Sequence, residues 1–208
     1  YKSSSIGSIS DYTCFSFQAI KHLTTGDGGA IAIKNYNKYI EAKRKRWFGL
    51  DRENSQVSDL GERDCNVFEL GYKYHLNDLS ASLGLSNLKS LKGQLIKRRE
   101  IASFYDKNLK DVSSINLFKK DKYKNLNSNW LYGFHVEGRD NFIKYMKANN
   151  IPVSVVHQGI DKNNIFGGKD VTLINQRRFD ESQIHIPMHG SLSTEQIEFI
   201  IETIKKGW

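Results

Sequence analysis

Cysteine and proline are both scarce in this sequence, with two residues of each among 208. Cys14 and Cys65 stand far apart, so they form neither a disulfide framework nor a metal-binding cluster. The low proline content and the lack of any low-complexity tract exclude a disordered chain. Cys14 lies in an apolar segment, so we expect it to be a small buried residue.

Long hydrophobic runs are also absent. No apolar stretch approaches the roughly 20 residues that a membrane-spanning helix needs. The first eleven residues are polar and serine-rich, unlike a secretory signal. Together with the unpaired cysteines, these features predict a protein of the reducing cytoplasm without a membrane partner.

Positive charge exceeds negative charge, with 31 Lys and Arg against 23 Asp and Glu and a net charge of +8. Such a balance suits nucleic acid, an anionic surface or a phosphorylated small molecule. The basic residues occur in short, scattered runs, which is typical of solvated helix faces. A nucleic-acid-binding module is therefore an alternative, although the sequence contains no recognised nucleic-acid-binding motif.

The first part of the chain predicts two strands followed by a helix. The strands cover residues 12–17, expected to be buried, and 30–33. A helix over 37–47 follows, and Gly49 could end it. Residues 51–64 are polar and irregular, so we expect a surface loop.

A long helix is predicted from Asn77 or Asp78, either of which can cap it, to about Leu109. Gly84 and Gly93 allow a break or a close contact with another element. Leucines recur at spacings of three and four, which places them on one face that we expect to pack against other helices. The leucines of this face are Leu76, just before the helix, and Leu79, Leu83, Leu88, Leu91 and Leu95 within it.

The last part of the chain predicts a small α+β layer after a lysine- and asparagine-rich connection over 111–128. The predicted strands cover residues 130–136, 152–157 and 184–187. Asp140 is expected to cap the helix that follows the first of them. Ser193 and Gln196 form a capping box before an amphipathic final helix.

One segment near the start is the most informative in the chain: residues 15–29, FSFQAIKHLTTGDGG. A lysine follows a short aromatic strand, with a hydroxyl five residues before it and a glycine-rich turn after it. The glycines lack the lysine spacing of a phosphate-binding loop, so a tight turn into the next strand is expected. By itself, Lys21 could be a surface lysine, and Ser16 could bond its own backbone.

The same segment resembles the S-F-x-x-x-K and G-[DE]-G-G patterns of the DegT-type sugar aminotransferases, a branch of the fold-type-I pyridoxal-phosphate enzymes. The resemblance implies that Lys21 bonds to the cofactor aldehyde and carries the proton between substrate and cofactor. It also implies that Ser16 donates to the cofactor phosphate. A related branch has histidine at the lysine position and performs dehydration. Lys21 argues against that branch, although His22 stands beside it.

A second resemblance covers residues 71–81, GYKYHLNDLSA. The family commonly shows G-[YF]-N-Y-R-[ML] here, and its asparagine reaches the cofactor phosphate of the neighbouring subunit. In this chain Lys73 replaces the asparagine and His75 replaces the arginine, so both are candidate cofactor-binding residues. In the structural alternative, Tyr72 and Tyr74 pack the loop and Lys73 faces solvent.

Two further segments resemble the family more loosely. His157 matches its V-x-x-H segment, and His189 matches its S-[LI]-P-[ML]-H segment, which makes both candidate substrate contacts. No carboxylate or cysteine accompanies them at ligand spacing, so a metal site is not expected. Residues 47–52, WFGLDR, resemble W-[FY]-G-[IL]-D-R of one subgroup, without an evident chemical role. The structural alternative for both histidines is a satisfied position in the fold.

The resemblance implies an α/β fold: part of a fold-type-I large domain over residues 1–110, with an incomplete sheet, and a small α+β domain over 111–208. It implies a pyridoxal-phosphate-dependent aminotransferase that moves an amino group, usually from glutamate, to a nucleotide-linked keto-sugar. It also implies a homodimer with shared active sites. A non-catalytic remnant that keeps the fold or the dimer surface is the main alternative.

The position of Lys21 limits this expectation. In the family the aspartate partner of the pyridinium nitrogen, the ring-stacking residue and much of the phosphate site come from the N-terminal half, whose positions this sequence does not contain. We therefore expect this chain alone to bind the cofactor weakly or not at all.

Overall fold

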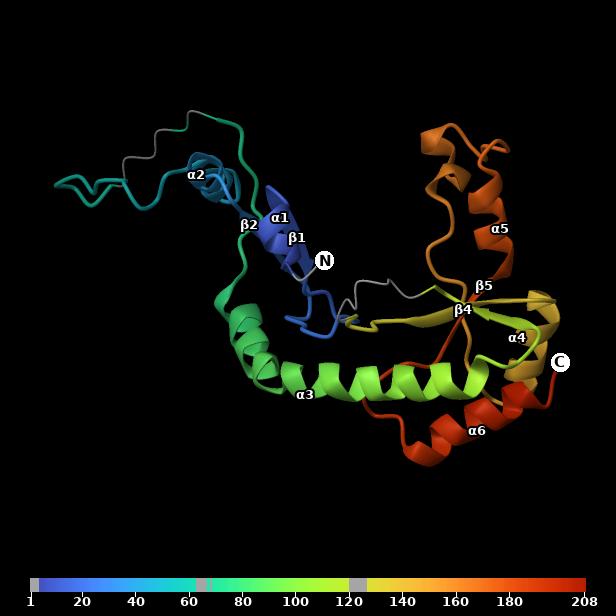
Figure 1. The fold of residues 1–208 in the computed structure, drawn as a ribbon. Helices are drawn as coiled ribbons and strands as arrows, with labels where there is room; N and C mark the ends of the chain where they lie inside the picture. Colours follow the sequence, from blue (N-terminus) through green and yellow to red (C-terminus); the bar gives the residue numbers. More distant parts are fainter. Residues whose placement is uncertain (1–3, 63–66, 68, 120–126) are drawn as a thin grey trace. The chain divides into compact units, whose positions relative to one another are not determined.

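A computed structural model of the chain describes residues 4–62, 67, 69–119 and 127–208, so Cys65 lies outside the described residues. The contacts divide the chain into two compact units, Tyr1–Leu91 and Lys92–Trp208. Figure 1 labels the helices and strands of each unit. The domain division at residue 110 stays a prediction. No helix among the described residues combines the length and the apolar character needed to cross a membrane.

Unit 1 contains an antiparallel hairpin of β1 (Tyr12–Ser16) and β2 (Gly29–Ile33), in which Tyr12 pairs with Ile33 and Ser16 with Gly29. Both strands were expected, but the predicted burial of the first is wrong. Four of the five β1 residues are exposed, including Cys14. A hairpin of two strands cannot bury both of its own faces.

Two helices flank this hairpin in the sequence, the short α1 (Ile6–Ile9) and α2 (Tyr36–Lys45). The side chain of Asn35 accepts a hydrogen bond from Lys38 N at 3.0 Å, which caps α2. Shortly after α2 the chain turns through Phe48 and Gly49, which have φ of 57° and 76°. The predicted helix is confirmed, but it ends at Lys45, four residues before Gly49, so the expected stop at Gly49 is wrong.

The predicted long helix is confirmed as α3 (Asp78–Leu109), and Asn77 Oδ1 accepts from Ser80 N at 2.9 Å at its start. The expected packing of its leucine face is wrong for the first half, where Leu79 is 86% and Leu88 51% exposed. The buried residues of α3 are Ile101, Ala102, Tyr105 and Leu109. Periodicity identifies residues that share a face, but not what covers that face.

Unit 2 contains a three-stranded antiparallel sheet in the order β3 (Ile115–Leu117), β4 (Tyr132–Val136) and β5 (Gln183–Ile186). Strands β4 and β5 confirm two of the three predicted strands. Strand β3 was missed because it has only three residues, within a connection rich in lysine and asparagine.

The predicted strand over 152–157 is wrong. Only Ser154 forms a bridge there, with its N–H and C=O bonded to His185 at 3.0 and 2.9 Å. Pro152 has no N–H to donate to a ladder. His157 has φ of 61°, which is incompatible with a strand. The β-branched valines therefore lie in an irregular segment.

Three α-helices complete unit 2: α4 (Arg139–Ala148), α5 (Ile174–Ser182) and α6 (Thr194–Lys205). Helix α4 starts at Gly138 in a left-handed conformation, so the predicted Asp140 cap is wrong, and Asp140 lies in the first turn. Helix α5 was not predicted. For α6, Ser193 Oγ accepts from Gln196 N at 3.2 Å and Gln196 Oε1 from Ser193 N at 2.9 Å, which confirms the capping box.

The hydrophobic core lies in unit 2, where the sheet, the C-terminal part of α3, α4 and α6 meet (Figure 1). Phe134 at its centre is fully buried, as are Phe142 and Met146 of α4. Residues 157–182 form an arm that extends from this layer and contains the 3-10 turns η1 (Ile160–Lys162) and η2 (Asn164–Phe166), followed by α5 (Figure 1).

Candidate functional site

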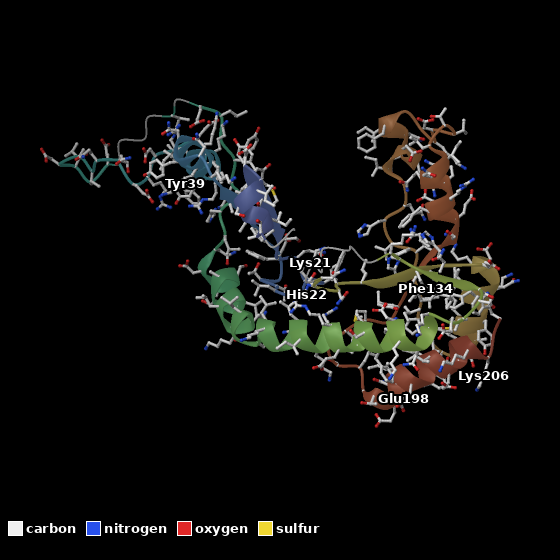
Figure 2. All side chains as sticks on the ribbon, in the orientation of Figure 1. Lys21, His22, Tyr39, Phe134, Glu198 and Lys206 are labelled. Atoms are coloured by element: carbon white, nitrogen blue, oxygen red, sulfur yellow. The ribbon has the colours of Figure 1, made fainter. Side chains whose placement is uncertain are left out.

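Lys21 lies in a closed loop between β1 and β2 (Figure 2). Phe17 N donates to Gly28 O at 2.8 Å, and Thr25 N donates to Phe17 O at 2.9 Å. Lys21 N donates to Gln18 O at 2.9 Å, which turns the chain just before the lysine. These bonds hold a half-buried lysine at the end of the hairpin.

Helix α3 anchors this loop. Thr25 is 5% exposed, and a Cβ atom built on Gly84 would lie 2.7 Å from its methyl carbon. Asn87 Nδ2 donates to Thr24 O at 2.9 Å. Gly84 thus makes the close contact that the sequence allowed, whereas a Cβ atom at Gly93 would meet nothing within 4 Å.

The glycines after Lys21 serve close packing of the turn. A Cβ atom at Gly28, where φ is 147°, would lie 2.7 Å from Thr25 Oγ1, and one at Gly29 would lie 2.7 Å from Phe15 O. Gly28 N donates to Asp27 Oδ1 at 3.0 Å. The expected tight turn into the second strand is confirmed.

Ser16 and Lys21 supply two groups that fit pyridoxal phosphate. The exposed Ser16 Oγ accepts from Gln18 N at 3.4 Å, which leaves its own proton to donate to an anion. The Lys21 amine is the nucleophile type that reacts with an aldehyde. Ile20, the residue before Lys21, is 60% exposed in this unit.

The loop that contains Lys73 and His75 packs on the turn after α2. Phe48 N donates to Tyr72 O at 3.0 Å, and Tyr72 N donates to Lys45 O at 2.7 Å. A Cβ atom at Gly71 would lie 1.8 Å from Gly49 N, so this approach of two backbones requires glycine. Gly49 and Gly71 are the sequence signal from which the contact between these two segments could have been predicted.

Trp47 is the common neighbour of the two candidate cofactor residues in this loop. The Lys73 Nζ lies 5.9 Å from its ring centroid, and the His75 ring lies edge-on at 4.1 Å. Nδ1 of His75 is buried and has no hydrogen-bond partner within the described residues. The rings of Tyr72 and Tyr74 stack at 5.1 Å, as in the structural alternative.

A cavity of about 310 Å³ opens beside His75 in unit 1. Arg46, Trp47 and Arg52 line it, and the Arg52 guanidinium lies 4.7 Å from the Trp47 ring centroid. Asp51, Glu53 and Asp78 also contribute to its wall, so its charge is mixed rather than uniformly positive.

In unit 2, the exposed His157 has φ of 61°, and its ring centroid lies 5.7 Å from that of Trp130. His189 is exposed and follows the buried Met188. Arg98 NH1 donates to Asn129 O, Trp130 O and Met188 O at 3.3, 3.2 and 2.9 Å. The sequence singled out neither Trp130 nor Arg98 as a site residue.

His135 of β4 and His185 of β5 are two further histidines of unit 2 that the sequence did not single out. Burial lowers the pKa of both, and the nearby His157 lowers that of His185 further. A Cβ atom at Gly133 would lie 2.7 Å from the ring of His185, so this imidazole lies against bare backbone. His135 Nδ1 pairs with Ser182 Oγ at 2.8 Å.

The sequence profile of the DegT/DnrJ/EryC1/StrS aminotransferase family matches residues 1–205. This chain belongs to that family. Over its whole length it is 30% identical to the UDP-4-amino-4,6-dideoxy-N-acetyl-beta-L-altrosamine transaminase of Campylobacter jejuni, of which it covers 57%. The chain therefore spans just over half the length of this family member.

Solved structures of family members share its fold. The sugar aminotransferase CalS13 from Micromonospora echinospora superposes with a TM-score of 0.91 at 29% identity, and AtS13 from Actinomadura melliaura with 0.91 at 31%. The chain is covered completely in both cases, and it covers 55% and 54% of those proteins. The predicted family and α/β fold are confirmed.

Proposed function

We propose that this chain provides the C-terminal part of a pyridoxal-phosphate-dependent aminotransferase that transfers an amino group, usually glutamate's, to a nucleotide-linked keto-sugar. One observation carries the proposal. Lys21 and Ser16 belong to one closed loop, anchored to α3 through Thr25 and Gly84, in a chain of this family. A Streptococcus pneumoniae relative, Spr1654, has been solved in a form with the cofactor, at 29% identity.

Each candidate residue has a role in this proposal. Lys21 would hold the cofactor through its neutral amine, which bonds to the aldehyde carbon while the aldehyde oxygen leaves as water. Once released, the same amine would carry a proton to or from the substrate carbon. Ser16 donates its hydroxyl proton to the cofactor phosphate. Lys73 and His75 supply a cation and an N–H donor toward an anionic group. Bound pyridoxal phosphate supplies the electron sink.

The remaining parts of the proposal concern substrate and assembly. His157 and His189 contact the nucleotide-sugar in unit 2. The exposed apolar side chains of the hairpin, Tyr12, Phe15 and Ile31 at 50–52%, suit coverage by further strands or helices of a larger domain. We infer a cytoplasmic homodimer, in which a second subunit adds to each site.

Covalent capture of the cofactor tests the proposal. A protein that contains this chain and the remaining length of its relatives is incubated with pyridoxal phosphate, reduced with borohydride and digested, and the modified peptide is identified by mass. We expect the adduct on Lys21, and its loss in Lys21→Ala. Lys34→Ala, in the residue after β2, is the matched control and should keep the adduct.

The chain by itself is expected to give a weak cofactor absorbance band or none. A strong band in the isolated chain would contradict that expectation. An adduct on another lysine, or none in the longer protein, would refute the catalytic role of Lys21 and favour a non-catalytic remnant.

A further inference from the structure

His157 is held in an unfavourable backbone conformation within unit 2. A non-glycine residue with φ of 61° is in the left-handed region, where its Cβ atom crowds the following carbonyl oxygen. Such a conformation is kept where several surrounding contacts hold the backbone in it, and residues of this kind cluster at functional sites. The contacts on either side of His157 are therefore informative.

On the N-terminal side, Gln183 fixes the preceding residue. Its Nε2 donates to Val156 O at 2.7 Å, and the Gln183 side chain is fully buried. Two residues further back, the bridge between Ser154 and His185 holds the chain against β5. Both contacts thus come from β5, from residues two positions apart.

On the C-terminal side, Asp180 fixes the residue two positions later. Both of its carboxylate oxygens accept from Gly159 N at 3.2 Å, and the Asp180 side chain is 3% exposed. A Cβ atom at Gly159 would lie 2.6 Å from Asp161 Oδ1 and 3.1 Å from Asp180 Oδ2, so both carboxylates lie close against this glycine.

The Asp180 carboxylate is itself held firmly. Gln176 Nε2 donates to it at 2.7 Å, and Lys162 Nζ lies 3.2 Å away. Burial alone raises the pKa of Asp180, but the hydrogen bonds from Gln176, Lys162 and Gly159 outweigh it and hold the pKa below its ordinary value. The charged form that accepts from Gly159 is therefore the stable one.

We propose that Gln183 and Asp180 are positioning residues that clamp the chain on both sides of His157 and present its imidazole beside Trp130. The proposal rests on the proposed function, in which His157 contacts the nucleotide-sugar. An exposed imidazole beside a half-buried indole offers an N–H donor and a flat apolar face, which suit a sugar or base ring. Arg98 holds the Trp130 backbone from the other side.

The first arm of the test is independent of ligand. In the isotope-labelled chain, a positive φ gives His157 a strong intraresidue HN–Hα nuclear Overhauser effect. We expect Gln183→Met and Asp180→Asn each to weaken this signal and to accelerate exchange of the Gly159 amide. Glu181→Gln, the same change at an exposed neighbouring position, is the matched control and should leave both unchanged.

The second arm uses the active aminotransferase that contains this chain. Each clamp variant should raise KM for the nucleotide-sugar about tenfold, because misplacement of a contacting group costs this order of affinity. The Lys21 adduct should be unaffected. Unchanged His157 signals in both clamp variants would overturn the proposal, and so would altered signals with an unchanged KM. Failure of the proposed function appears separately, as a missing Lys21 adduct in the unmodified protein.

Discussion

Gly84 of α3 approaches the methyl group of Thr25 so closely that an added Cβ atom would lie 2.7 Å from it. Thr25 is buried, and its hydroxyl donates to Asp27 O at 2.8 Å, so it cannot turn away without breaking the loop that contains Lys21. Together with the bond from Asn87 to Thr24 O, this contact links α3 to the loop that contains the candidate catalytic residue.

Gly84→Ala is therefore expected to lower the free energy of unfolding by about 1–3 kcal/mol, the usual cost of overpacking. Gly93→Ala in the same helix meets open space and should raise it by about 0.5–1 kcal/mol, because alanine favours the helix. Denaturant titration of both variants measures the difference. Equal effects of the two substitutions would refute the contact.

Arg98→Met should destabilise unit 2 by about 2 kcal/mol, since three backbone carbonyls lose a charged donor. Within the described part of the chain, the neighbouring Arg99 donates to Asn127 O alone, at 3.0 Å, in a solvent-exposed bond. Arg99→Met should therefore cost no more than about 0.5 kcal/mol. Thermal unfolding of the two variants, side by side, decides whether the bonds of Arg98 to these carbonyls stabilise unit 2.

Acid should weaken the fold through His185. Burial lowers the pKa of His185, so below its ordinary value of about 6.5 the unfolded chain binds more protons than the folded one. Stability is then full above that value and falls as the pH drops toward the folded-state pKa, by at most about 1.4 kcal/mol per pH unit.

The dependence is measured as the free energy of unfolding between pH 7.5 and pH 5, a range set by the histidine window. His185→Gln should flatten the slope, whereas His189→Gln, at an exposed position, is the control. His135, whose pKa burial also lowers, should leave a residual slope in the His185 variant. A slope that His185→Gln does not change would exclude this histidine as its source.

Ser16→Ala should weaken cofactor binding about tenfold in the longer protein that contains this chain, because one hydrogen bond to a charged phosphate is worth about 1.5 kcal/mol or more. The free energy of unfolding should change little, since Ser16 is exposed. Absorbance titration with pyridoxal phosphate gives the affinity. Ser8→Ala changes another exposed serine, whose hydroxyl donates to Ser5 O, and should bind like the unmodified protein.

Local signals in the sequence determined several features correctly. The capping box at Ser193, the start of α3 at Asn77 and the tight turn after Lys21 each depend on residues within a few positions of one another. The family was recognisable at residues 15–29 for the same reason, because its pattern lies in one continuous segment of the sequence.

Long-range contacts decided the rest, and no local pattern contains them. The leucines of α3 share a face by spacing, yet their exposure depends on what lies opposite them. The valines before His157 favour a strand, but Gln183, far along the chain, bonds Val156 and helps to hold a left-handed residue there instead. The sequence thus determined the family and the tight turn after Lys21. Only the tertiary structure decided which residues hold that loop and His157 in place, because distant side chains supply those contacts.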